Sequence, residues 1–264
     1  MCDDARVPHA DLGEVRLYYE RAGTGTPELL FISGWCCDHT AFQPQFDHFA
    51  RTNAVTTFDL RGVGESDQPA GGYSIPELAD DAVALCAELG IERPVVIGHS
   101  LGGMIAVELG ARSPALPAAL VLLDPGPIDP LPETVERFRS FADQLEGPDG
   151  AEVRRAAVHD MGADARDEEV GRWIVELICA DPQRVAAAVV RGISEWNGHD
   201  LLARCTMPVL LLRTELETDT DLPRLLELKP DLDGGLTIGS GHFHQIEVPG
   251  QVNAMIERFL SISL

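Results

Sequence analysis

A serine flanked by glycines, at the junction of a strand-like and a helix-like segment, constrains this chain more than any other feature. Residues 95–97 form a short apolar run that is typical of a buried strand, and residues 104–111 are compatible with a helix. Between these runs stands Gly98-His99-Ser100-Leu101-Gly102. A strand, a sharp turn with this spacing and a helix together predict that the Ser100 hydroxyl is presented at the carboxyl edge of a sheet.

The residues around this serine favour a catalytic role over an inert serine in a turn. Gly98 and Gly102 lack side chains that would crowd a tight turn. The backbone N–H of Leu101 is expected at the start of the following helix, where a developing negative charge is stabilised. The glycine spacing alone occurs often by chance, so the prediction rests on the strand and helix that surround it.

Strand-like and helix-like segments alternate through most of the chain. Apolar or alternating runs predict strands at residues 15–19, 29–33, 54–58, 95–97, 119–123, 209–212 and 236–238. This alternation predicts an α/β fold with a mostly parallel central sheet and helices on both faces. Residues 128–205 carry helical patterns without a good strand. We therefore expect a core of residues 1–127 and 206–264, with 128–205 inserted as a helical cap.

The charge of the chain argues against two classes of partner. The chain has 43 acidic and 20 basic residues among 264, which give a net charge of −23. A surface this acidic repels nucleic acid and anionic membranes, so neither is expected, and the expected partner is a small-molecule substrate. No basic segment followed by an apolar core opens the chain, and no apolar run approaches the ~20 residues of a membrane helix, which predicts a cytoplasmic protein. The sequence does not decide whether the protein forms a homo-oligomer.

The cysteines and histidines indicate neither a disulfide framework nor a metal site. Six cysteines in a chain of this length are typical of free thiols. His242 and His244 lie two residues apart, but no further cluster of ligand residues accompanies them. We therefore expect no metal and no cofactor.

An activated serine needs a base, and the base needs a carboxylate that orients it. His242 is the best candidate for the base, because it follows a predicted strand and a Gly-Ser-Gly turn that bring it to the same sheet edge as Ser100. The chain order, with the serine first and the histidine last, also fits this assignment. His244 is the alternative base, and His99 is expected to pack beneath the serine turn.

Four segments together resemble α/β-hydrolase-fold proteins, and the resemblance covers essentially the whole chain. They are Phe31-Ile32-Ser33-Gly34-Trp35, Asp59-Leu60-Arg61-Gly62-Val63-Gly64-Glu65-Ser66, Gly98-His99-Ser100-Leu101-Gly102-Gly103 and Gly239-Ser240-Gly241-His242-Phe243. The resemblance implies that the N–H of Trp35 is an oxyanion donor together with that of Leu101. The family usually has His-Gly where this chain has Ser33-Gly34. These motifs are specific for the fold and say little about the substrate.

The orienting carboxylate has two candidates. Most of the family carries it in a Gly-x-x-Asp turn after the strand predicted at residues 209–212, where this chain lacks the glycine and has Glu217 in place of the aspartate. Some members take it from the end of the preceding strand, which here is Asp124. We favour Asp124, because it directly follows the apolar run 120–123, whereas Glu217 lies in a polar run typical of a solvated loop. An aspartate before a proline also starts turns without catalytic use.

A narrower resemblance runs through Gly34-Trp35-Cys36-Cys37-Asp38-His39. The segment is similar to one in cofactor-independent dioxygenases that open quinolone rings on the same fold, although those enzymes have a histidine at the position of Cys37. They also carry the acid at the Asp124 position, and they use histidine and aspartate to deprotonate the substrate. Lactonases that open the ring of zearalenone place the acid there too. The arrangement of acid and base therefore does not separate hydrolysis from oxygenation.

Two further residues are candidates for contact with the substrate. Trp196 lies shortly before the predicted return to the sheet, where caps on this fold commonly line the pocket, and it is equally compatible with the core of the cap. Cys36 lies beside the expected oxyanion donor. We expect a serine hydrolase of carboxylic esters or lactones in which Ser100, His242 and Asp124 are catalytic. The alternatives are the dioxygenase and, more distantly, a small-molecule receptor without catalysis.

Overall fold

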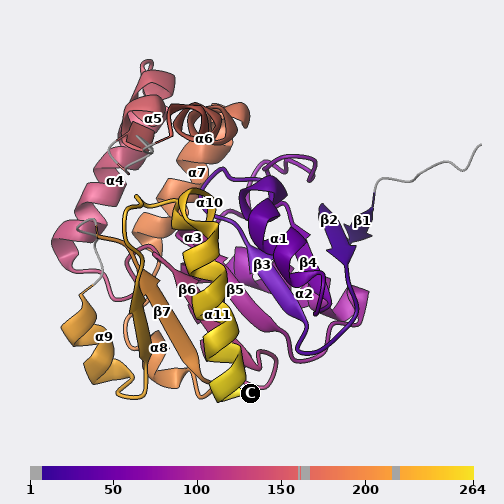
Figure 1. The fold of residues 1–264 in the computed structure, drawn as a ribbon. Helices are drawn as coiled ribbons and strands as arrows, with labels where there is room; N and C mark the ends of the chain where they lie inside the picture. The colour runs from indigo at the N-terminus through magenta and orange to yellow at the C-terminus, as the bar shows by residue number, and fades with distance from the viewer. Residues whose placement is uncertain (1–7, 160, 162–166, 216–220) are drawn as a thin grey trace, which may run out of the picture.

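The computed structural model describes residues 8–159, 161, 167–215 and 221–264, and its centre is an eight-stranded sheet (Figure 1). The strand order is β1-β2-β4-β3-β5-β6-β7-β8. β2 pairs antiparallel with both β1 and β4, and all other neighbouring strands are parallel. The strands are β1 (His9–Asp11), β2 (Arg16–Ala22), β3 (Leu29–Ile32), β4 (Val55–Phe58), β5 (Val95–His99), β6 (Ala119–Leu123), β7 (Val209–Arg213) and β8 (Asp233–Leu236).

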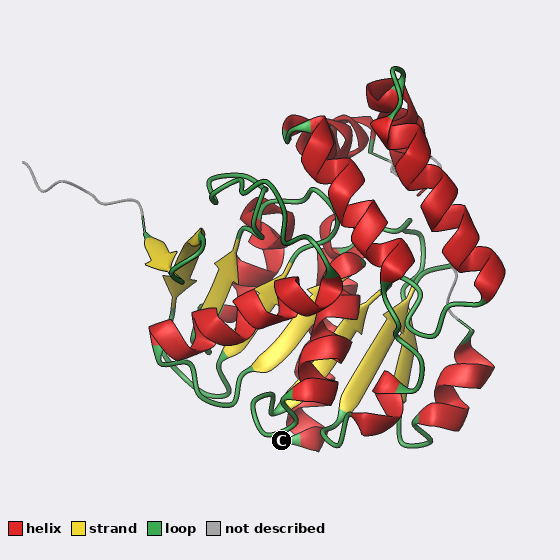
Figure 2. Ribbon diagram, turned by 180° about the vertical axis from the view of Figure 1, so that it is seen from behind, coloured by secondary structure: helices red, strands yellow, loops and turns green. Residues whose placement is uncertain are grey.

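Helices cover both faces of the sheet, because its central strands are apolar on both sides. Along β3, Leu29 and Phe31 pack into the core on one face, and Leu30 and Ile32 pack into the core on the other. Side chains alternate in this way along any strand, so a fully apolar run needs cover on both faces. The first face is covered by α1 (Gln43–Phe49) and α11 (Pro249–Ser263), and the second by α2 (Ile75–Leu89), α3 (Leu101–Arg112) and α8 (Leu201–Arg204) (Figures 1 and 2).

Between β6 and β7 the chain leaves the sheet and forms a group of helices. These helices lie over the edge at which the parallel strands end (Figure 2). They are α4 (Pro132–Glu146), α5 (Gly150–Val158), α6 (Glu168–Ala180) and α7 (Gln183–Glu195). We propose that α4 to α7 form the cap predicted for residues 128–205, since α8, at the end of that range, packs against α3 of the core instead.

Most predicted strands are present, and the last one is displaced. β6 has the predicted bounds, Ala119–Leu123. The final strand was predicted at residues 236–238 from its apolar side chains, but β8 spans Asp233–Leu236. Its Gly235 pairs with Leu212, and a Cβ atom on this glycine would lie 2.7 Å from Leu212 Cδ2. Small residues let this strand approach β7, and apolar patterning does not detect that.

Two short elements were not predicted, and each is only three or four residues long. Such lengths leave too few side chains for a period to be recognised. The two elements are β1 and α10 (His244–Glu247). The remaining short elements are η1 (His39–Phe42), which leads directly into α1, and α9 (Leu222–Leu228).

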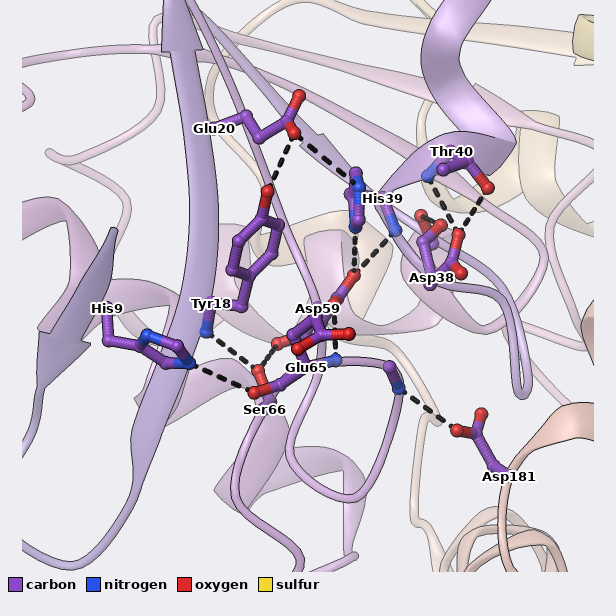
Figure 3. A network of polar contacts seen from close by, with 12 residues as sticks. His9, Tyr18, Glu20, Asp38, His39, Thr40, Asp59, Glu65, Ser66 and Asp181 are labelled. Carbon is purple, nitrogen blue, oxygen red and sulfur yellow. Dashed lines mark hydrogen bonds and ion pairs between the residues drawn. The ribbon is translucent and has the colours of Figure 1, made fainter. Parts of the chain in front are cut away.

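The loop after β4 is held by a buried carboxylate at the same end of the sheet as the serine turn (Figure 3). Asp59 Oδ1 accepts hydrogen bonds from the backbone N–H of His39 at 2.6 Å and from its Nδ1 at 2.9 Å. Asp59 Oδ2 accepts from the Glu65 N–H at 2.9 Å, and the Ser66 hydroxyl donates to the Asp59 carbonyl at 2.7 Å. These bonds determine the path of residues 59–66.

The described cysteines are free thiols, as the sequence predicts; they are Cys36, Cys37, Cys86, Cys179 and Cys205. Burial raises the pKa of Cys86 and of Cys205 to about 12, so both stay protonated at neutral pH. Over the described part of the chain, no helix has the length and apolar character needed to cross a membrane.

Candidate active site

Ser100 occupies the turn between β5 and α3 in a strained backbone conformation. Its φ is +51° and its ψ is −114°, a combination that residues with side chains rarely adopt. Such strain persists only where the surrounding structure enforces it. Here the Ser100 N–H donates to the Leu123 carbonyl at 3.0 Å, and the Ser100 carbonyl accepts from the Gly126 N–H at 3.1 Å. The end of β6 therefore holds the serine in place.

Close backbone contacts require the glycines of this turn. A Cβ atom on Gly98 would lie 2.1 Å from the Gly102 carbonyl oxygen, and one on Gly102 would lie 2.0 Å from the carbonyl oxygen of Ile32. Both distances are far shorter than van der Waals contact, and the opposing atoms belong to the backbone, which has no room to move aside. The crowding expected from the sequence is present, and it packs the turn against β3.

A histidine and a buried aspartate from distant parts of the chain lie in contact. Nδ1 of His242 is 2.6 Å from Oδ2 of Asp124. Asp124 directly follows β6, is 1% exposed, and donates its N–H to the Leu212 carbonyl at 2.7 Å. His242 lies in the loop after β8, and its side chain is 15% exposed. A carboxylate so placed orients the imidazole ring and stabilises its protonated form.

The other two histidines near this pair are buried and neutral. His99 donates its Nε2–H to the carbonyl of His242 at 2.9 Å, and burial lowers the pKa of His99 well below its ordinary value. Nδ1 of His244 lies 3.0 Å from the Thr237 hydroxyl, and burial lowers the pKa of His244 to about 4. His99 thus packs beneath the turn and supports the backbone of His242. His244, the alternative base, does not line the cavity beside Ser100.

A cavity of about 1140 Å³ brings the candidate residues together. Ser100, Asp124 and His242 all line it. Among the described contacts, no hydrogen bond joins the Ser100 hydroxyl directly to His242, and such bonds often tighten only when substrate is bound. The apolar part of the wall consists mainly of Trp35, Leu101, Met104, Phe138, Phe141, Val190 and Ile193, and the charged part of Glu133, Glu136 and Arg137 on α4.

Two backbone N–H groups near Ser100 are those expected to bind a negative oxygen. They belong to Trp35 and Leu101, which both line the cavity. Within the described structure, neither N–H donates to another residue. Leu101 is the first residue of α3, and the first N–H groups of a helix have no partner inside the helix. The helix dipole adds positive potential there, which suits an oxygen that gains negative charge.

The structure corrects two predictions about the cavity wall. Trp196 is 6% exposed and donates its indole N–H to Glu108 Oε2 at 2.8 Å, so it packs against α3 and does not line the cavity. Cys36 is 1% exposed and is also not part of the wall, because its thiol faces Arg154 of the cap. The alternative acid, Glu217, lies outside the described residues.

Phe138 and Phe141 were missed by the sequence analysis. Both line the cavity from α4. They lie three residues apart, which places them on the same face of the helix. They are also the large aromatic residues of a helix that is otherwise mostly polar or charged. An aromatic pair with this spacing in a polar helix was a detectable signal of an apolar contact.

Comparison with known proteins confirms the resemblance over most of the chain. The model of the alpha/beta hydrolase family matches residues 29–255. The putative carbamate hydrolase RutD of Azorhizobium caulinodans is 33% identical over 118 residues, which are 45% of this chain and 44% of that protein. The match therefore spans less than half the length of this relative.

Two other proteins match over most of their length. The 2-(acetamidomethylene)succinate hydrolase of Mesorhizobium japonicum is 27% identical over 259 residues, which cover 88% of this chain and 87% of that protein. The solved structure of Est816, described as an N-acyl homoserine lactone degrading enzyme, has a TM-score of 0.84 and 27% identity, and the match covers 96% of this chain and 100% of that one.

Proposed function

Because the chain belongs to the alpha/beta hydrolase family, we propose that it is a serine hydrolase that cleaves a carboxylic ester or a lactone through an acyl-serine intermediate. The observation that carries this proposal is the contact of 2.6 Å between His242 and Asp124 in the wall of the cavity that also contains Ser100. A nucleophile, a base and a carboxylate that orients the base are the groups that acyl transfer requires.

In the first step, His242 acts as the general base. Its Nδ1 is engaged by Asp124, so Nε2 takes the proton of the Ser100 hydroxyl. The Ser100 oxygen forms a bond to the substrate carbonyl carbon, and the carbonyl oxygen becomes negative. Asp124 stabilises the resulting imidazolium, and its burial keeps water from screening the interaction.

The N–H groups of Trp35 and Leu101 bind the negative oxygen of the tetrahedral intermediate. When the intermediate collapses, the imidazolium of His242 gives its proton to the leaving alkoxide, and the acyl group stays on Ser100. In a lactone the leaving alcohol remains attached to the acyl group. A water molecule deprotonated by His242 then releases the carboxylic acid and restores the serine.

The wall of the cavity supports a neutral substrate with a bulky apolar acyl group or ring. Most of its surface consists of aromatic and aliphatic side chains from the loop after β3 and from α3, α4 and α7. The exposed Glu133 and Glu136 on α4 and the net charge of −23 disfavour an anionic substrate. The names of the two relatives that match over most of their length, one a hydrolase and one an enzyme that degrades a lactone, support this reaction class.

A panel of p-nitrophenyl esters and a neutral lactone tests the activity, and a fluorophosphonate probe tests the nucleophile. We expect the probe to label Ser100, as located by peptide mass spectrometry, and Ser100→Ala to lower kcat by roughly 10³-fold or more. Ser113→Ala, at the other end of α3, is the matched control and should retain turnover and labelling. A wild-type protein that neither reacts with the probe nor turns over esters or lactones would refute the proposal.

The geometry favours one second candidate. The contact of His242 with Asp124 is formed, whereas no direct hydrogen bond to the Ser100 hydroxyl exists among the described contacts. A reaction that needs the histidine and the aspartate but not the serine therefore also fits. The cofactor-independent dioxygenase suggested by residues 34–39 is such a reaction. Turnover of a 4-quinolone that needs dissolved oxygen and survives Ser100→Ala would replace hydrolysis with this activity.

A further inference from the structure

The side chain of Trp35 is held by helices of the cap, although its backbone belongs to the loop after β3 of the core. Its indole N–H donates to the carbonyl of Ala186 on α7 at 3.0 Å. The Phe141 ring on α4 packs edge-on with ring centroids 5.6 Å apart, and the guanidinium carbon of Arg154 on α5 lies 5.8 Å from the centroid of the indole. Trp35 thus connects three cap helices to a backbone N–H that borders the cavity.

Arg154 is a buried cation whose hydrogen-bonding capacity is mostly unused. Only 2% of it is exposed, and its Nη1 donates to the carbonyl of Asp181 at 2.8 Å. Its Nε and Nη2 atoms are buried and have no hydrogen-bond partner within the described structure. Buried polar groups without partners destabilise a fold. A side chain that carries two of them calls for a role other than stability.

The charge of Arg154 lies beside Cys36 in the loop after β3, and one described carboxylate, that of Asp181, lies close enough to interact with it. Its guanidinium faces the thiol of Cys36, the residue after Trp35. Burial raises the pKa of Cys36 to about 12, so this thiol stays neutral. Among the described residues, the partner that accepts from Arg154 is a backbone carbonyl and not a carboxylate. The charge of Arg154 also lowers the pKa of the Asp181 carboxyl, against the rise that burial causes, so the two side chains interact electrostatically.

The same series of contacts continues into the core. Asp181 accepts from Arg154 through its backbone carbonyl, and its Oδ1 accepts a hydrogen bond from the Gly64 N–H at 3.0 Å. Gly64 belongs to the loop that Asp59 holds, and Figure 3 shows Asp181 facing this loop from the side of the cap. Asp181 therefore links Arg154 to the core, and the guanidinium carbon of Arg154 lies over the Trp35 ring.

We propose that Arg154 is a positioning residue of the reaction, and this inference rests on the hydrolysis proposed above. Arg154 holds the Trp35 indole against the cap and so sets the direction of the Trp35 backbone N–H toward the oxyanion. An N–H held in the right direction binds the negative oxygen of the transition state more strongly than the neutral carbonyl oxygen of the ground state. The effect of Arg154 is therefore on the chemical step and not on the binding of substrate.

Arg154→Met, which keeps much of the side-chain volume and removes the charge, tests this role. We expect kcat for a p-nitrophenyl ester to fall on the order of 10- to 100-fold, while KM stays within about twofold. The melting temperature should stay the same or rise, because apolar residues often replace buried charges without loss of stability. Arg154→Lys restores a cation and should recover part of kcat. Arg155→Met, at an exposed neighbour on α5, is the matched control and should behave like the wild type.

A pair of ketone inhibitors separates positioning from a structural role. The serine oxygen adds to the carbonyl carbon of a trifluoromethyl ketone and forms a tetrahedral adduct with a negative oxygen. The matching methyl ketone binds without forming this adduct. We expect Arg154→Met to weaken the first inhibitor by about the same factor as kcat/KM and to leave the second unchanged. Equal losses for both inhibitors, or a kcat equal to that of Arg155→Met, would overturn the proposal.

Labelling of Ser100 by the fluorophosphonate, measured in parallel on the wild type and on Arg154→Met, tells the two proposals apart. If wild-type Ser100 is labelled and Arg154→Met has an unchanged kcat, the positioning role of Arg154 is refuted while the hydrolysis proposal stands. A wild-type protein that is not labelled and does not turn over esters or lactones refutes hydrolysis, and the role of Arg154 with it.

Discussion

Nδ1 of His242 and Oδ2 of Asp124 lie 2.6 Å apart although 118 positions separate the two residues in the chain. Three parallel strands determine this distance. Asp124 directly follows β6 and donates its N–H to the Leu212 carbonyl of β7, while His99 at the end of β5 donates to the backbone carbonyl of His242. A base held in this way needs little reorganisation when it takes a proton.

Asp124→Asn keeps the shape of the side chain and removes the charge that orients His242. We expect kcat to fall on the order of 10²- to 10⁴-fold, because the imidazole loses its orientation and its protonated form loses a counter-charge. Glu217→Gln is the comparison variant and should lower kcat by less than about tenfold. Steady-state kinetics on the best ester substrate measure both. The opposite order of losses would assign the orienting role to Glu217.

Gly102→Ala tests the steric demand of the serine turn. The added Cβ would lie 2.0 Å from the Ile32 carbonyl oxygen and 2.9 Å from that of Ser33, so the turn must shift away from β3. We expect the free energy of unfolding to fall by about 1–3 kcal/mol, measured by urea denaturation, together with a loss of turnover. Gly250→Ala, with no atom within 4 Å of its Cβ position, is the control. A Gly102→Ala protein as stable and active as this control would contradict the packing argument.

Trp196→Phe and Phe141→Ala should affect different properties. Trp196→Phe removes the N–H that bonds Glu108, and we expect a loss of about 1–3 kcal/mol in the free energy of unfolding with KM unchanged. Phe141→Ala enlarges the cavity wall, and we expect KM for an ester with a bulky acyl group to rise roughly tenfold. Urea denaturation and steady-state kinetics on both variants separate the two effects. A raised KM in Trp196→Phe, with KM unchanged in Phe141→Ala, would place the substrate against Trp196 and not against Phe141.

Asp181→Asn should change how stability depends on pH. Burial raises the pKa of Asp181 to about 6, above its ordinary value of 3.8. The folded state therefore binds this proton more tightly than the unfolded state does, and the stability from Asp181 is fully present below pH 3.8 and is lost as the pH rises through about 6. Asparagine stays neutral and still offers an oxygen to the Gly64 N–H. We expect the melting temperature of Asp181→Asn minus that of the wild type to grow between about pH 4 and pH 6 and to level off above about pH 7.

The exposed Asp233 provides the control for this pH series. Asp233→Asn removes one negative charge as well, so it reports the general effect of charge on this acidic protein. We expect its difference in melting temperature from the wild type to change little over the same pH range. A similar slope for both variants would show that the effect belongs to net charge and not to the burial of Asp181.

Local patterns were sufficient for the parts of the molecule whose physical demands lie within a few residues. The apolar runs at β5 and β6 need cover on both faces, and the sequence shows that directly. The tight turn at Ser100 follows from Gly98 and Gly102, because the crowding atoms belong to neighbouring segments that the fold class already places there. The order of strands and motifs likewise indicated which residues reach one edge of the sheet, and it pointed to Asp124 and His242 as neighbours.

The tertiary structure alone decided which side chains face the cavity. Trp196 bonds Glu108 across 88 positions, and Trp35 bonds Ala186 across 151 positions. The spacing of Phe138 and Phe141 indicates an apolar contact, but it does not show whether an aromatic residue of the inserted segment faces the cavity, as Phe141 does, or is buried away from it, as Trp196 is. Their orientation depends on how α4 and α7 pack over the sheet, and that packing is the sum of many contacts between residues far apart in sequence. The sequence by itself determined the fold and the edge at which the site lies, since strand periodicity and turn sterics act locally. The wall of the cavity and the contact of Arg154 with Trp35 were decided by long-range packing.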